Sequence, residues 1–267
     1  MPRFSANLSM LFDDVPFVDR FARAAEAGFD AVEYLFPYEH DAADLRRSLD
    51  EHGLRQDLFN LPAGDFAAGE RGIAVDPARR EQFAQGVELA ARYAAALGCR
   101  KLNCLVGTRP QGVPWETQYA CLVENLRAAA ARLGRDGVTL HAELLNPIET
   151  PGFFLDSMDL VRRLLDDVPA LWFQCDVYHL QRTQGDLVGT MRSVSDRIGH
   201  VQIADSPDRH EPGTGEIAYD FVLRELDALG YTGCVGLEYR PSAGTEETLG
   251  WIDALGYALP RRLAAGR

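Results

Sequence analysis

Four polar side chains in the second half of the chain are spaced as a shared metal site would require. Each ends a short apolar run, at positions 143, 176, 202 and 238, so the intervals are 33, 26 and 36 residues. Intervals of this size match one strand and helix unit, so neighbouring parallel strands would bring the groups to one end of a barrel. Three carboxylates and one amide oxygen repel one another without a cation, and an all-oxygen set suits Mg²⁺ or Mn²⁺. We therefore expect a divalent metal ion bound by Glu143, Asp176, Gln202 and Glu238.

Each of these side chains could instead be a simple cap for the helix that follows its strand. Alternation along the apolar runs favours the shared site, because residues two apart on a strand face the same side. Glu143 then shares a face with His141, and Gln202 shares one with His200, whereas the opposite faces are mostly apolar. We expect the polar set to face the barrel axis and the apolar set to meet the surrounding helices.

The elements that must position these groups recur along the whole chain. Amphipathic helical stretches end in glycine and are followed within a few residues by a short apolar run, because glycine readily adopts the left-handed conformation that ends a helix. Eight strands are expected, over residues 4–9, 30–34, 54–59, 99–104, 138–143, 171–176, 198–204 and 234–238. About 33 residues per unit fits a (β/α)₈ TIM barrel that forms a single domain over 1–267. An open doubly wound sheet is the alternative, although its Gly-x-Gly-x-x-Gly signature is missing.

Composition narrows the classes of partner. The chain has a net charge of −13 and 46% hydrophobic residues, which indicates a globular protein without the basic face that nucleic-acid binding needs. It has no apolar run long enough for a membrane span and no leader pattern at its start, so we expect a cytoplasmic protein that binds neither nucleic acid nor membrane. The five cysteines show no metal-binding spacing, so we expect reduced core thiols.

Several segments together resemble the hydroxypyruvate isomerase family, which belongs to the xylose-isomerase-like barrels. The resemblance runs nearly end to end. Its segments are Phe4-Ser-Ala-Asn-Leu-Ser-Met10, Ala31-Val-Glu-Tyr34, His141-Ala-Glu-Leu-Leu-Asn146, Asp176-Val-Tyr-His179, His200-Val-Gln-Ile-Ala-Asp205 and Gly236-Leu-Glu-Tyr239.

The resemblance implies that Glu143, Asp176, Gln202 and Glu238 occupy the metal-binding positions of the family. It also implies that Glu143 and Glu238 are the proton donor and acceptor. Related ketose epimerases usually have a histidine where this chain has Gln202, and an endonuclease branch resembles the chain in fold alone. Barrels of this family are often oligomeric, so a homo-oligomer is possible.

The expected activity is a metal-dependent isomerisation of a small 2-keto acid, in which hydroxypyruvate and tartronate semialdehyde interconvert through an enediolate. His179 is expected to donate to a substrate oxygen from the loop after its strand. Arg209 is the first choice to pair with the substrate carboxylate, and Arg240 is the second. The alternatives are a 2-oxo-tetronate isomerase, a ketose 3-epimerase and a sugar-acid-binding protein without turnover.

Overall fold

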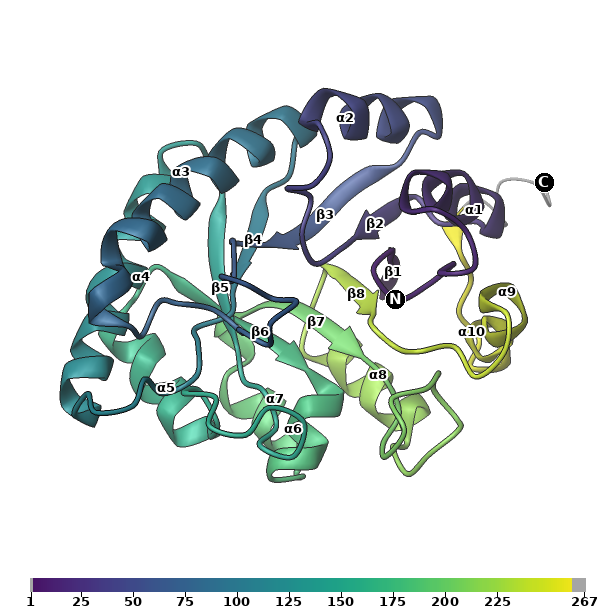
Figure 1. Ribbon diagram of the computed structural model, residues 1–267. Coiled ribbons are helices and arrows are strands. Elements are labelled where there is room, and N and C mark those ends of the chain that lie inside the picture. The colour runs from purple at the N-terminus through teal and green to yellow at the C-terminus, as the bar shows by residue number, and fades with distance from the viewer. Residues whose placement is uncertain (1, 261–267) are drawn as a thin grey trace.

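Eight parallel strands close into a barrel whose strand order follows the chain (Figure 1). The computed structural model describes residues 2–260. β1 pairs with β8 as well as with β2, which closes the sheet and excludes the open doubly wound alternative. The strands are β1 (Arg3–Asn7), β2 (Ala31–Glu33), β3 (Arg55–Asn60), β4 (Lys101–Cys104), β5 (Thr139–Glu143), β6 (Leu171–Asp176), β7 (Ile198–Ile203) and β8 (Cys234–Leu237). The predicted (β/α)₈ barrel is confirmed.

Helices follow every strand and surround the barrel; in Figure 1, α2, α3, α4 and α5 form an arc outside strands β3 to β6. The α-helices are α1 (Arg20–Ala27), α2 (Ala42–Glu51), α3 (Arg80–Leu97), α4 (Trp115–Gly134), α5 (Met158–Asp167), α6 (Val177–Thr183), α7 (Leu187–Ser193), α8 (Tyr219–Ala228), α9 (Thr245–Thr248) and α10 (Gly250–Ala254). Short 3₁₀ turns are η1 (Phe17–Asp19), η2 (Pro77–Arg79) and η3 (Ser195–Arg197).

Glycine ends two of the helices where the sequence predicts it. Gly28 follows α1 with φ 109°, and Gly98 follows α3 with φ 69°, so both lie in the left-handed region. The helix α4 also ends in a glycine, Gly134, as the sequence predicts, but the left-handed residue comes three positions later, at Gly137, with φ 69°. Residues 135–137 form the turn that leads to β5, which begins at Thr139.

Two predicted strands run two residues past one end of the observed ones, because neighbouring backbone groups bond elsewhere. The first ends at Asn7, whose carbonyl accepts from the amides of Met10 and Leu11 in a turn. The fourth begins at Lys101, because the amide of Cys99 still bonds to the carbonyl of Ala94 at the end of α3.

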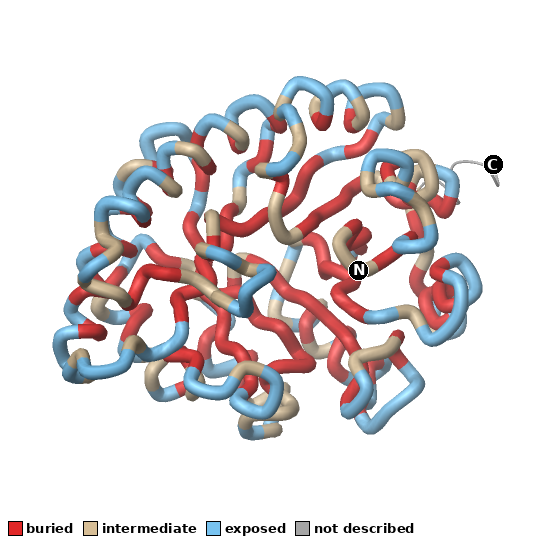
Figure 2. Tube along the Cα trace, in the orientation of Figure 1, coloured by how far each residue is buried: buried red, intermediate tan, exposed pale blue. Residues whose placement is uncertain are grey.

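The register brings the predicted site residues to neighbouring positions at one end of the barrel. Asp176 on β6 pairs with Gln202 on β7, and Gln202 pairs with Gly236 on β8. Glu143 on β5 pairs with Gln174, two residues before Asp176. Figure 2 shows the strands buried and the outer helix faces exposed. The alternation predicted from the sequence therefore has its polar set inside the barrel.

Within residues 2–260, none of the helices is both long enough and apolar enough to cross a membrane. The five cysteines are buried and free, as expected.

Candidate active site

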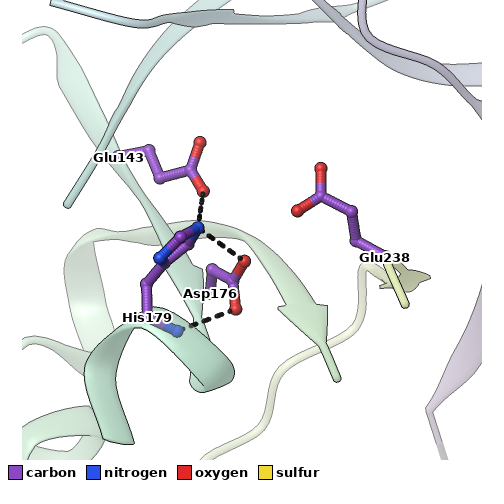
Figure 3. Close-up of side chains that lie close together, drawn as sticks. All are labelled: Glu143, Asp176, His179 and Glu238. Atoms are coloured by element: carbon purple, nitrogen blue, oxygen red, sulfur yellow. Dashed lines mark hydrogen bonds and ion pairs between the residues drawn. The ribbon is translucent and has the colours of Figure 1, made fainter. Parts of the chain in front are cut away.

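Three carboxylates and one histidine meet at the carboxyl end of the strands (Figure 3). Glu143 ends β5, Asp176 ends β6, His179 lies in the first turn of α6, and Glu238 directly follows β8. One ligating atom from each lies within 4.8 Å of the others, and all four side chains are buried. The His179 ring lies between two of the carboxylates, with Nε2 4.0 Å from Glu143 Oε1 and 3.7 Å from Asp176 Oδ2.

Asp176 both caps a helix and faces the cluster. Its Oδ1 accepts from the backbone amides of Tyr178, at 2.8 Å, and of His179, at 3.3 Å. Its Oδ2 is buried with no hydrogen-bond partner among the described residues. Capping by Asp176 starts α6 immediately after β6, which places His179 on a helix; the expectation that it lies in a loop is wrong. Asp176 therefore caps the following helix and also belongs to the shared site, so the two interpretations do not exclude each other.

Gln202 lies beside the cluster, with its amide nitrogen toward Glu238. Its Nε2 donates to Glu238 Oε1 at 3.2 Å and to Glu33 Oε1 at 2.8 Å. Its Oε1 accepts from Gln174 Nε2 at 2.6 Å, and the same Gln174 nitrogen donates to Glu143 Oε2 at 3.0 Å. Gln202 therefore contacts Glu238 of the predicted site. Its amide oxygen, which is its only atom that could bind a metal ion, faces Gln174.

Arg209 reaches into the cluster from the loop after β7. Its guanidinium hydrogen-bonds to Glu238 Oε2, and its Nη2 lies 3.6 Å from Asp176 Oδ2. It also pairs with Glu149, at 3.4 Å, and stacks over the ring of Tyr178. The side chain is 11% exposed, whereas Arg240 is exposed. Of the two arginines that the sequence offers, Arg209 is thus the one buried against the cluster.

Burial and like charge set the protonation of the two glutamates. Burial raises the pKa of Glu143 well above its ordinary value, and the nearby carboxylates of Glu238 and Asp176 raise it further. Burial raises the pKa of Glu238 to about 8, against the opposing effect of the Arg209 guanidinium. Each glutamate can therefore hold a proton near neutral pH.

His179 has the opposite response to burial, because its charged form is the protonated one. Burial lowers the pKa of His179 to about 4, although Asp176 opposes this. The backbone amide of Asn146 donates to Nδ1 at 3.2 Å, so the neutral ring carries its proton on Nε2. That N–H points into the cluster as a hydrogen-bond donor.

The donor set fits a hard divalent cation. Glu143, Asp176 and Glu238 bring carboxylate oxygens together in a buried space, and Asp176 Oδ2 has no hydrogen-bond partner among the described residues, although Arg209 and His179 lie 3.6 and 3.7 Å from it. His179 fits the role of ligand less well, since its Nε2 carries the proton while Asn146 occupies Nδ1.

Sequence reasoning missed Glu33 as a residue of the site. It is fully buried and contacts Gln202 and Asn7, each of which also donates to Glu238. An acidic residue inside the buried run Ala31–Glu33 is the signal that could have found it, because buried carboxylates require partners.

Comparison with known proteins agrees with this geometry. The family described as xylose isomerase-like TIM barrel matches residues 21–255. The chain is 50% identical to hydroxypyruvate isomerase of Escherichia coli, with 95% of this chain and 99% of that protein covered. It is 44% identical to 2-oxo-tetronate isomerase of Cupriavidus necator, over 94% of this chain and 98% of the relative.

One similar crystal structure is described as AP endonuclease, family 2, from Brucella melitensis. It has a TM-score of 0.90 and 44% identity, and the match covers 95% of this chain and 99% of that one. The curated relatives confirm the predicted class at the level of an isomerase. The chain therefore belongs to the xylose isomerase-like TIM barrel family, among relatives that include hydroxypyruvate isomerase and 2-oxo-tetronate isomerase.

Proposed function

We propose that this isomerase interconverts hydroxypyruvate and tartronate semialdehyde and depends on a divalent metal ion, Mg²⁺ or Mn²⁺. The observation that carries the proposal is the buried cluster of Glu143, Asp176 and Glu238, in which two glutamates have raised pKa values. The identity of 50% to hydroxypyruvate isomerase of Escherichia coli supports the choice of substrate.

The ion would be held by Glu143, Asp176 and Glu238, with Gln202 as the fourth ligand through its amide oxygen. When bound, it supplies stabilisation for the negative charge that develops on the substrate oxygens. Gln202 Oε1 already accepts from Gln174 Nε2 at 2.6 Å, so the ion would use its second lone pair.

Proton transfer falls to Glu143 and Glu238. One of them, as carboxylate, takes a proton from C3 of hydroxypyruvate, and the substrate becomes an enediolate. The same residue or the other then returns a proton to C2, while the proton of the C3 hydroxyl moves to the C2 oxygen, so that C3 becomes the aldehyde and C2 carries the hydroxyl. A carboxyl group whose pKa is near 8 suits both proton transfers, because it can hold and release a proton near neutral pH.

His179 and Arg209 are proposed to bind the substrate. The Nε2–H of His179 points into the cluster and can donate to a substrate oxygen, which agrees with its neutral state. Burial lowers the pKa of Arg209, but the surrounding carboxylates, Glu238 first, raise it overall, so the guanidinium is charged and can pair with the substrate carboxylate.

A 2-oxo-tetronate isomerase is the second candidate, because a relative with that name is 44% identical over most of both chains. The same side chains would act on a substrate one carbon longer. We favour a small-molecule substrate over a nucleic acid, despite the similarity to the Brucella melitensis structure. The net charge of −13 opposes binding to a phosphate backbone.

Proton NMR in D₂O tests the proposal. Metal-loaded protein is incubated with hydroxypyruvate and, separately, with a four-carbon 2-oxo acid that carries a 3-hydroxyl, each with and without EDTA. We expect aldehyde product and deuterium incorporation only with metal, and the relative rates choose between the two names. No conversion of either substrate above the protein-free rate would refute the keto-acid isomerase. Ketose 3-epimerisation and simple binding of a sugar acid would then be tested.

A further inference from the structure

A buried carboxylate lies directly beneath the candidate site and collects four hydrogen-bond donors. Glu33, at the end of β2, has no exposed surface. Its Oε2 accepts from Ser5 Oγ at 2.8 Å and faces His200 Nε2 at 2.9 Å. Its Oε1 accepts from Gln202 Nε2 at 2.8 Å and from Asn7 Nδ2 at 3.3 Å. Every contact of this carboxylate is therefore with a group that can donate.

The two amides connect Glu33 to the candidate proton-transfer residue. Asn7 Nδ2 donates to Glu238 Oε1 at 3.3 Å, and Gln202 Nε2 donates to the same oxygen at 3.2 Å. Each NH₂ group thus bridges one oxygen of Glu33 and one oxygen of Glu238. The other oxygen of Glu238 is left to Arg209.

This arrangement selects one orientation of each amide. A carboxylate only accepts hydrogen bonds, so the end of each amide that faces Glu33 must be its nitrogen. A 180° flip would turn an amide oxygen toward both carboxylates, and it would also break the bonds that the oxygens accept, from the Ser9 amide to Asn7 Oδ1 at 3.0 Å and from Gln174 Nε2 to Gln202 Oε1 at 2.6 Å. The flip would also turn the Gln202 oxygen away from Gln174 and toward the barrel interior.

We propose that Glu33 is a positioning residue, which holds the amide nitrogens of Asn7 and Gln202 toward Glu238 and so fixes the orientation of that carboxylate. The inference rests on the proposed function, because it assigns Glu238 a part in metal binding and proton transfer. It assigns Glu33 no contact with the substrate.

Gly236 gives independent support, since it leaves room for this carboxylate. A Cβ at position 236 would lie 2.3 Å from Oε1, 2.4 Å from Oε2 and 2.5 Å from Cδ of Glu33. Gly236 pairs with Ser5 on one side and Gln202 on the other, so the space lies inside the network. The glycine on β8 therefore permits the placement of Glu33.

A second metal ion explains this cluster less well. Glu33, Asp57 and His200 bring potential ligand atoms within 4.8 Å of one another. However, Lys101 Nζ lies 3.1 Å from Asp57 Oδ2, and an Arg55 nitrogen lies 2.8 Å from Oδ1. Two side-chain cations already neutralise Asp57, and they would repel a third.

The main test replaces Glu33 with glutamine, which keeps the shape and removes the acceptor-only character. One end of the glutamine amide is then an NH₂ group, which faces hydrogen-bond donors and cannot accept from them. We expect Glu33→Gln to weaken Mn²⁺ binding, measured by electron paramagnetic resonance, by about tenfold or more. At saturating Mn²⁺ we expect kcat to fall by about 10- to 100-fold and KM to change by less than about threefold. A fall in kcat accompanied by an equally large rise in KM would overturn the proposal. Wild-type values of kcat and Mn²⁺ affinity would also overturn it.

Ser5→Ala is the matched control, because it removes a buried donor to the other oxygen of Glu33 and leaves both bridging amides in place. We expect its Mn²⁺ affinity and kcat to stay within about threefold of the wild type. A loss as large as that of Glu33→Gln would mean that any damage to the network suffices, and would overturn the specific role of Glu33.

A measurement on the wild-type protein keeps the test independent of how the variants fold. A neutron structure with bound Mn²⁺ distinguishes the nitrogen and oxygen of the Gln202 and Asn7 amides. We expect both nitrogens to face Glu33, and an oxygen facing it would overturn the proposal. Failure of the proposed function is seen separately, as a wild-type protein that binds Mn²⁺ with these amide orientations but converts neither keto acid.

Discussion

Metal binding should release protons, because the raised pKa of Glu238 means that its carboxyl group is mostly protonated at neutral pH in the metal-free protein. A metal ion binds the carboxylate and must displace that proton. With a pKa of about 8, the protonated fraction is about 0.9 at pH 7 and about 0.1 at pH 9. The direction of the pKa shift at Glu143 is the same, so its proton adds to the total at the lower pH. We therefore expect release of about one proton or more per Mn²⁺ at pH 7, falling steeply by pH 9.

Isothermal titration calorimetry with Mn²⁺ measures this release directly. Two buffers with different ionisation enthalpies are compared at each pH, and the difference in heat gives the number of protons taken up by the buffer. The Glu238 proton alone should make the apparent affinity rise about tenfold per pH unit below pH 8, and this contribution should become level above it. Glu238→Gln should lower the release at pH 7 by about 0.9 protons. The surface variant Glu124→Gln should leave it unchanged, because Glu124 is exposed and lies outside the cluster.

A heat of binding that does not depend on the buffer at pH 7 would refute the reasoning. It would mean that Glu143 and Glu238 are already ionised before metal binds, so that burial is outweighed by the Arg209 guanidinium. Release that persists undiminished in Glu238→Gln would assign the proton to another group.

Three further predictions concern catalysis and stability. Glu143→Gln should lower turnover of the keto acid by about 10²- to 10⁴-fold while the circular dichroism spectrum is unchanged. EDTA should abolish turnover and added Mn²⁺ or Mg²⁺ should restore it, whereas activity that survives dialysis against EDTA with no residual metal would exclude a metal-dependent reaction. Gly72→Ala should destabilise the fold by about 2 kcal/mol or more in urea unfolding, because Gly72 has φ +104° and its Cβ would lie 1.7 Å from the Leu105 carbonyl oxygen. Gly69→Ala, with φ +98° and no atom within 4 Å, should cost only about 1–2 kcal/mol.

The regular spacing of strand and helix units along the chain made the barrel and the carboxylate cluster predictable. Glu143, Asp176 and Glu238 lie at the ends of β5, β6 and β8, and closing the sheet brings such ends together whatever the helices do. Strand alternation also predicted correctly that the polar side faces the barrel interior. These features follow from local patterns of two and about 33 residues, which a single sequence displays.

The conformation of Arg209 could not be predicted in this way. It has φ 61°, a left-handed backbone, and its amide bonds to the carbonyl of Asp205 four residues earlier. This loop geometry, and not the sequence interval, directs the guanidinium to Glu238. The position of His179 depended on a similar local choice, since Asp176 caps α6 immediately and turns the expected loop into a helix.

Glu33 was missed because its partners are remote in sequence. β2 has only three residues, too few to display an alternating pattern, and the nearest contact of Glu33 with the candidate site is Gln202, 169 positions away. The sequence contains no local signal that would predict the contact between Glu33 and Gln202. Only the closed barrel, in which β1 and β8 alone separate β2 from β7, reveals it.

The polar interior below the site carries an energetic cost that a purely apolar core would avoid. Barrel interiors are usually filled by branched apolar side chains, but here Glu33, Gln174, Gln202 and His200 meet inside the strands. Buried polar groups destabilise a fold unless each finds a partner, and a satisfied network then permits few alternative arrangements. The amide of Gln202 has both ends bonded, so its orientation is fixed before any ligand arrives. An apolar replacement of Glu33 would leave buried donors such as Ser5 Oγ and Gln202 Nε2 without their acceptor, so stability and turnover should both fall at this position.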